Sequence, residues 1–212
     1  SLERNGLDDD VREIANLGGD LWVAGSFSQT ADDPITLTGL NGLTRYRPPT
    51  DSFVNKELQG NPIGFMPFQG GIGLNGEVRA IESGPGGVLY VGGDFLQSYD
   101  GTVGLGRIAR FDPVTKQWSA LALGGLNGRV RALAVNGNTL YVGGDFTRTI
   151  DNSIVLNRIA RYDLTTNTWS AMPRNGLDNG VYAMKVVGND LYLGGLCQNT
   201  RDFLLRINLI AR

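Results

Sequence analysis

The chain has 212 residues, a formal net charge of −2 and a sequence pI of about 5.2. It is long enough to bury the core of one or two domains. No basic patch is present, so we expect no nucleic acid partner, and no apolar run reaches the roughly 18 residues of a membrane helix, so we expect no membrane insertion. Histidine is absent, which excludes Ser-His-Asp and Cys-His nucleophile systems and His-ligated zinc.

Two further residue types bound the interpretation. The sequence contains 31 glycines, roughly twice the average share, and they indicate turns and strand crossings because they do not cluster in low-complexity runs. The single cysteine, Cys197, cannot form an internal disulfide. It has no neighbouring cation to stabilise a thiolate, so we interpret it as a small apolar core residue.

Four similar stretches follow one another along the chain. They read "GLDDDVREIANLGGDLWVAGSF", "GLNGEVRAIESGPGGVLYVGGDF", "GLNGRVRALAVNGNTLYVGGDF" and "GLDNGVYAMKVVGNDLYLGGLC". The repeat valines are Val11, Val78, Val130 and Val181. Repeats of about 50 residues are typical of propeller blades. We therefore predict one propeller domain or propeller segment spanning 1–212, with units at about 7–56, 74–121, 126–172 and 177–212.

Each unit has the pattern of four short strands. In the third unit "VRALAV" alternates, which would place Val130, Ala132 and Ala134 on one face and the residues between them on the other. "NGNT" is a hairpin turn signal, and the glycines of "LYVGGDF" make room for a closely approaching backbone. "RIARYD" and "TWSAM" complete the unit. Four-stranded sheets repeated about an axis form an all-β propeller.

The third and fourth strands share an aromatic spacing. The pairs, seven residues apart, are Tyr46 and Phe53, Phe111 and Trp118, and Tyr162 and Trp169. With the diglycine, this spacing resembles the repeat of kelch-like and galactose-oxidase-like propellers. The chain is even more similar to bacterial repeat proteins of the "LYVGGDF…RIARYD…W" type, which are related to the propeller of the fungal cortical polarity marker Rax2. The resemblance implies a kelch-like propeller with the tryptophans buried against the next blade. It does not carry galactose-oxidase copper chemistry, which needs histidine ligands.

Two units depart from the pattern. The first has an apolar insertion at 57–72, placed after its fourth strand, that contains Phe65 and Phe68; it reads either as a loop folded over one end or as a ligand or partner surface. In the fourth unit, "LLRINLIAR" matches "NRIARYD" through Arg206 and Ile207, and no tryptophan strand follows. We therefore predict that the last blade lacks its outer strand. We expect its bare edge to be covered by a longer native chain or by a second copy; the alternative is a closed four-bladed monomer with the segment near Ser1 beside the last blade.

An arginine and an aspartate recur together in the repeat. Arg79 corresponds to Arg131 as Asp94 corresponds to Asp145, and the fourth unit replaces both members, with Tyr182 and Leu196. The parallel loss indicates that the two positions touch, as structural bridges. The functional alternative is a ring of groups at the central channel that binds a small anion or sugar. The candidate binding residues are Arg12, Arg79, Arg131 and Tyr182, together with Phe65 and Phe68 of the insertion.

Acidic residues precede the first strand of the first unit. Asp8, Asp9 and Asp10 are interpreted as a turn or solvated loop, with Ca²⁺ as the alternative because carboxylates are its preferred ligands. No twelve-residue calcium loop is present. We predict no other metal, no catalytic residue and no other cofactor.

The patterns together favour a non-enzymatic structural or interaction module of a secreted or cell-surface protein. Polar loops on a rigid scaffold would bind a protein or glycan. One alternative is a carbohydrate-active lyase or hydrolase that uses loop carboxylates with Arg or Tyr in the central channel. Another is a self-assembling unit, a homo-oligomer that closes the incomplete blade.

Overall fold

The computed structural model describes residues 7–29, 40–47, 64–66, 73–203 and 210–211, which form four antiparallel sheets. Sheet I contains β1 (Val11–Leu17), β2 (Asp20–Gly25), β3 (Leu43–Arg47) and β4 (Gly64–Met66). Sheet II contains β5 (Val78–Gly84), β6 (Val88–Gly93), β7 (Ile108–Asp112) and β8 (Gln117–Ala120). Sheet III contains β9 (Val130–Asn136), β10 (Thr139–Gly144), β11 (Ile159–Asp163) and β12 (Thr168–Ala171). Sheet IV contains β13 (Val181–Val187), β14 (Asp190–Gly195) and β15 (Ile210–Ala211).

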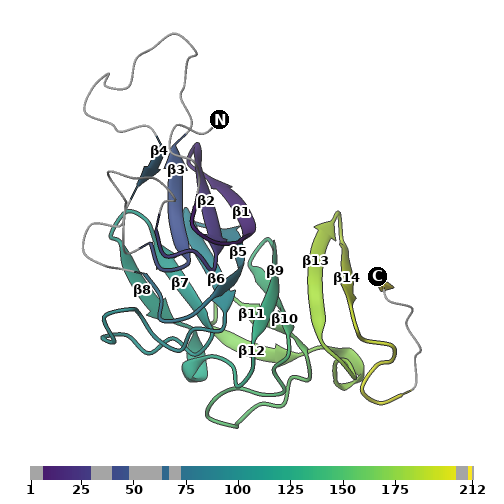
Figure 1. Cartoon of the computed structure of the whole chain (residues 1–212). Helices are drawn as coiled ribbons and strands as arrows, with labels where there is room; N and C mark the ends of the chain where they lie inside the picture. Colours follow the sequence, from purple (N-terminus) through teal and green to yellow (C-terminus); the bar gives the residue numbers. More distant parts are fainter. Residues whose placement is uncertain (1–6, 30–39, 48–63, 67–72, 204–209, 212) are drawn as a thin grey trace.

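The sheets follow one another in chain order, from purple sheet I to yellow-green sheet IV (Figure 1). Within each sheet, consecutive strands pair as hairpins. The first strands lie beside one another, β1 by β5, β5 by β9 and β9 by β13. Two 3-10 turns, η1 (Ala122–Gly124) and η2 (Pro173–Asn175), follow the fourth strands of sheets II and III. In the described residues, no helix has the length and apolar character of a membrane span.

The second glycine of each repeat lies against a backbone carbonyl. These glycines are Gly25, Gly93, Gly144 and Gly195, and a Cβ at any of them would overlap the carbonyl oxygen of the residue before the repeat valine. The same oxygen accepts a hydrogen bond from the residue after the glycine, as in Asp94 N to Glu77 O at 2.9 Å and Asp145 N to Arg129 O at 2.8 Å. The glycine is therefore required by a close backbone approach.

This approach coincides with a β-bulge in every sheet. The pairing register shifts immediately after the repeat valine, and the extra residue is Arg12, Arg79, Arg131 or Tyr182. The predicted alternation of the first strand is therefore wrong beyond Val130. Because Arg131 is bulged, Leu133 and not Ala132 shares the face of Val130, and both side chains reach the space beside Gly92.

The buried core lies between consecutive sheets. One cluster joins Trp22 and Ala24 of sheet I to Val78, Phe111 and Trp118 of sheet II. A second joins Tyr90 and Ile108 of sheet II to Val130, Tyr162 and Trp169 of sheet III. A smaller cluster contains Ile159, Leu177, Val181 and Cys197, so the cysteine is a buried core residue as predicted.

Trp118 and Trp169 are buried but contact the preceding sheet, which corrects the prediction that they face the next one. Trp169 lies directly opposite Tyr162, and their rings are 4.7 Å apart. Its Nε1 donates a hydrogen bond to Ala122 O, in the connection from sheet II, at 2.9 Å. Cross-strand partners share one face of a sheet, and in sheet III this face is the one directed toward sheet II.

Sheet I does not have the predicted fourth strand. We expected a strand around Phe53, which lies outside the described residues, with an insertion at 57–72 after it. The structure instead forms the fourth strand from Gly64–Met66, inside that predicted insertion, with Phe65 opposite Tyr46. Phe65 thus takes the register position that Trp118 and Trp169 take in sheets II and III.

The last strand also differs from its predicted register. We aligned Arg206 and Ile207 with the third strand, but the structure pairs Ile210 with Gly194 and Ala211 with Leu193. The third strand begins at the same distance from the second glycine in sheets II, III and IV: Gly93 to Ile108, Gly144 to Ile159 and Gly195 to Ile210. The connection length sets the register. The predicted edge at 204–209 lies outside the described residues, and in the described part sheet IV has three strands.

The two glycines of one repeat should differ in their tolerance of a methyl group. Gly144→Ala should destabilise the protein by about 1–3 kcal/mol or more, because the Cβ would overlap the fixed carbonyl of Arg129. Gly143→Ala should cost less, because the Cβ would meet the side chain of Val181, which can shift. Sheet I already has buried Ala24 at this position. Urea unfolding of both variants measures the difference, and an equal loss of stability would contradict the backbone role.

Candidate functional site

The bulge residues form a row of charges at the start of the first strands. Arg12 Nη2 lies 3.1 Å from Asp10 Oδ2, and Arg12 Nε lies 2.8 Å from Glu77 Oε1 of sheet II. Arg79 contacts the same Glu77 at 2.6 Å. Because the bulge frees each arginine from the strand alternation, neighbouring sheets can share these carboxylates.

The row continues into sheet III. Arg79 Nη2 lies 2.9 Å from Asp94 Oδ2, and Arg129 Nε lies 3.0 Å from Asp94 Oδ1. The latter contact is an ion pair without an aligned hydrogen bond, since Asp94 Oδ1 has no hydrogen-bond partner in the described part of the chain. Arg131 Nη2 lies 2.7 Å from Asp145 Oδ2. The structure thus brings together both arginine–aspartate pairs singled out in the sequence.

Tyr182 ends the row in sheet IV. The guanidinium carbon of Arg131 lies 4.7 Å from the centre of the Tyr182 ring, the geometry of a cation–π contact. The aromatic ring of sheet IV, at the position where the other sheets have an arginine, therefore contacts the arginine of the preceding sheet. Phe65 lies on β4, at the outer edge of sheet I, away from the first strands, and Phe68 lies outside the described residues. The structure does not bring Phe65 to the arginine row.

The row is electrically balanced. Its guanidinium groups belong to Arg12, Arg79, Arg129 and Arg131, and its carboxylates belong to Asp10, Glu77, Asp94 and Asp145. The hydrogen bonds from Arg79 to Asp94 raise the pKa of Arg79, although partial burial opposes the shift. A balanced row offers no excess of positive charge to attract a small anion. Binding at Arg12, Arg79, Arg131 and Tyr182 stays a prediction.

Sequence reasoning missed the members of the row that precede the repeat valine. Asp10, Glu77 and Arg129 occupy this position in sheets I, II and III, where sheet IV has Gly180. An alignment of the four repeats shows this position: the residue before the repeat valine is charged in three units, and its charge changes sign between them. It is the position that links one sheet to the next, through Arg12 with Glu77 and Asp94 with Arg129.

The acidic loop before β1 has separate structural partners. Asp8 accepts hydrogen bonds from the backbone of Ser28 at 2.9 Å and Gln29 at 3.0 Å. Burial acts to raise the pKa of Asp8, but these hydrogen bonds outweigh it and lower the pKa. Equivalent backbone hydrogen bonds are accepted in the later units by Asn75, Asn127 and Asp178. Among the described residues, no three His, Cys, Asp or Glu side chains come close enough together to hold a metal ion.

Two half-buried glutamates lie further along the first strands. Glu13 Oε2 accepts a hydrogen bond from Ile81 N of sheet II at 2.9 Å. Burial raises the pKa of Glu13, with a further contribution from the charge of Glu82, and burial also raises the pKa of Glu82. Lys185 of sheet IV partly opposes both shifts. The folded environment therefore shifts the balance of both carboxyl groups toward the neutral form, relative to the unfolded chain.

Antiparallel sheets that follow one another with their first strands side by side form a β-propeller. The candidate site residues lie on or next to these first strands. Residues 66–208 match the family described as the Rax2 C-terminal beta propeller domain. Because this match covers more than half of the chain, the chain belongs to that family.

The relatives agree with this fold. The chain is 32% identical, over 115 residues, to the polarized growth protein rax2 of Schizosaccharomyces pombe, covering 54% of this chain and 9% of that one. It is 18% identical to the extracellular domain of a putative one-component system of B. thetaiotaomicron, with a TM-score of 0.51 over 90% of this chain and 20% of that one. It is 16% identical to the computationally designed Ika4 protein, with a TM-score of 0.51 over 92% and 90%. The chain therefore spans a small part of the two natural relatives.

The arginine–aspartate contact should contribute measurably to stability. We expect a double-mutant cycle of Arg131→Ala and Asp145→Ala to give a coupling above the roughly 1 kcal/mol limit of exposed pairs, because both groups are half-buried and hydrogen-bonded. The more exposed pair of Arg12 and Asp10 is the control and should couple below that limit. Additive effects at Arg131 and Asp145 in chemical denaturation would remove the structural role and favour the binding role.

Glu13→Gln should stabilise the folded protein at neutral pH. The folded pKa of Glu13 is raised above its unfolded value, so the group's contribution to stability is lost as pH rises through the folded pKa, and the amide removes that loss. The gain should shrink as pH falls below the ordinary glutamate pKa of about 4.3. Thermal unfolding between pH 3 and pH 8, a range of about five units around that value, measures this dependence.

Asp163→Ala is the control of opposite sign. Backbone hydrogen bonds from Thr166 and Thr165 lower the pKa of Asp163, so its contribution is present at neutral pH and is lost as pH falls through the folded pKa. The variant should be less stable than the parent at neutral pH, and the gap should narrow in acid. The same pH dependence in both variants would disprove the burial of Glu13.

Proposed function

We propose that this chain is a non-enzymatic interaction module of a secreted or cell-surface protein, built as a four-bladed, kelch-like propeller segment. It binds a protein or glycan through the connections between the second and third strands of each sheet. The observation that carries this proposal is a rigid turn, repeated in three sheets, that presents a different exposed residue each time.

The turn has the pattern Ser/Thr-x-Asp. The hydroxyl of Ser98 donates to Asp100 at 2.5 Å, that of Thr149 to Asp151 at 2.6 Å, and that of Thr200 to Asp202 at 2.6 Å. All three hydroxyl residues are buried. Further backbone bonds close the turns, from Thr102 N to Asp100 and from Ser153 N to Asp151. These bonds fix the loops before any ligand arrives, which lowers the entropic cost of binding.

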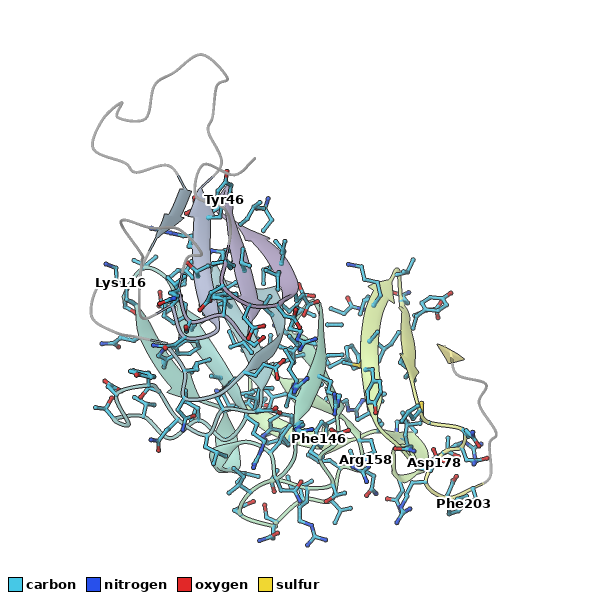
Figure 2. All side chains as sticks on the ribbon, in the orientation of Figure 1. Tyr46, Lys116, Phe146, Arg158, Asp178 and Phe203 are labelled. Carbon is cyan, nitrogen blue, oxygen red and sulfur yellow. The ribbon has the colours of Figure 1, made fainter. Side chains whose placement is uncertain are left out.

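The middle residue of each turn is exposed and differs between sheets. Tyr99 is 61% exposed and Ile150 is 41% exposed, and Arg201 is also exposed. The three turns lie in equivalent connections, so they share one end of the molecule. Figure 2 shows Phe203, two residues after Arg201, at the same end as Asp178 and opposite Tyr46.

Other apolar side chains extend this surface. Leu96, Val155 and Phe203 lie in the same connections and are exposed. Aromatic and aliphatic residues displayed on loops are typical of recognition surfaces, especially when an arginine accompanies them. A rim of this composition suits a protein or glycan ligand.

The comparisons support the cellular setting of the proposal. One solved relative is described as an extracellular domain, and the curated relative is described as a polarized growth protein. Propellers support many functions, so the assignment rests on the loop geometry more than on the fold.

The double variant Tyr99→Ser/Ile150→Ser should lose binding without loss of fold. We expect the labelled chain to bind at least one member of a glycan array or of a set of purified extracellular domains. The double variant should bind that ligand at least roughly tenfold more weakly, since two exposed anchors are removed. Val114→Ser, an exposed change in the β7–β8 turn, is the matched control and should bind normally.

A turnover assay on the same ligands separates the module from the carbohydrate-active alternative. Binding without product supports the module, whereas glycan cleavage that depends on loop carboxylates would establish an enzyme. Binding that is unchanged in the double variant would place the recognition surface elsewhere.

A further inference from the structure

Every sheet has two different faces. We call the face directed toward the preceding sheet the leading face; it carries the repeat valine and the apolar residue three positions later. The trailing face is directed toward the next sheet and carries the first glycine of the repeat and the aromatic residue two positions before it. In sheet III these are Val130 and Leu133 against Gly143 and Tyr141.

The internal contacts all join a leading face to a trailing face. Val130 of sheet III fills the space beside Gly92 of sheet II. In the next contact, Cγ1 of Val181 lies 2.7 Å from the position that a Cβ of Gly143 would take. The valine seats against the glycine, and both valines are fully buried.

The leading face of sheet I has the same residues but no cover. Val11 is 47% exposed and Ile14 is 55% exposed, whereas the equivalent Val78 and Ile81 are 0% and 2% exposed. Nothing in their chemistry distinguishes the two sets. Sheet I therefore exposes the first-strand part of its leading face, whereas Val23 of β2 is buried on that face.

The trailing face of sheet IV is the complementary surface. It carries Tyr192, which is 37% exposed where the equivalent Tyr90 is 6% exposed. Lys185 lies directly opposite Tyr192, with Ala183 and Val187 on the same face, and all three are exposed. Gly194 occupies the first-glycine position, paired with Ile210. Because both terminal faces are exposed, they do not cover each other within one copy.

We propose that a second copy of this chain covers these faces by docking head to tail. The leading face of sheet I in one copy seats on the trailing face of sheet IV in the other, with Val11 beside Gly194 as Val181 lies beside Gly143. The contact continues the series already made inside the chain, with the same residue types on each side. A second identical contact closes the pair, as a heterologous contact does when its rotation closes.

The charged row is compatible with this docking. Leu196, at the position of Asp94 and Asp145, is exposed on sheet IV. In the contact between sheets II and III this position is Asp94, whose carboxylate lies beside Arg129. Asp10 is the residue before the repeat valine in sheet I, and it already contacts Arg12. The new contact therefore needs no further salt bridge at Asp10. It also brings no second carboxylate toward Asp10, because Leu196 stands where the other sheets have an aspartate. The closed pair would contain eight sheets, within the known range of about four to eight blades.

Sedimentation of the purified chain and of two face variants tests the docking. We expect the parent to have twice the mass of one chain. Val11→Asp on the leading face and Tyr192→Asp on the trailing face should each give a folded monomer, because each variant spoils both contacts of the pair. Val114→Asp is a change at a more exposed side chain away from both faces and should remain a dimer.

Mixing the two variants distinguishes head-to-tail docking from other dimers. Val11→Asp keeps an intact trailing face and Tyr192→Asp keeps an intact leading face, so the mixture can form one undamaged contact and should regain dimer mass at high concentration. A parent that is monomeric at every concentration overturns the proposal. So does a dimer that only one variant breaks, a dimer that neither breaks, or a mixture that stays monomeric.

Discussion

The close approach of one backbone to another at the second glycine of each repeat is the constraint on which the structure depends. Gly25, Gly93, Gly144 and Gly195 leave room for a carbonyl oxygen that a side chain would displace. That oxygen accepts a hydrogen bond from the next residue of the hairpin, and the first strand absorbs the geometry as a bulge. The bulge in turn decides which side chains enter the core and which leave it.

The same constraint explains the local geometry of the charged row. A bulged residue cannot continue the alternation, so Arg79 and Arg131 turn to the carboxylates beside the glycine. Their charges are then balanced by Asp94 and Asp145. Exposed apolar side chains lie elsewhere, on the loops that the Ser/Thr-x-Asp turns hold.

The sequence predicted much of the scaffold because the scaffold repeats. The all-β class and the contacts of Arg79 and Arg131 follow from aligned positions. The bulge was not predicted, because "VRALAV" fits a regular strand equally well. The fourth strand of sheet I was misplaced because Phe53 has the usual spacing from Tyr46, whereas a long connection brings Phe65 to that place. The Ser/Thr-x-Asp turns of "SYD", "TID" and "TRD" were not predicted, because a three-residue pattern is too short to indicate a hydrogen-bonded turn by itself.

The Ser/Thr-x-Asp turn separates the residues that hold a loop from the residue that the loop displays. Ser98 and Asp100 fix the chain on either side of Tyr99, and Thr149 and Asp151 do the same for Ile150. The middle position can therefore vary in size, charge and polarity while its surroundings stay constant. Gene duplication of such a unit multiplies the number of independently variable positions without new folding problems, so a repeat of this kind is a natural starting point for randomised libraries of binding proteins.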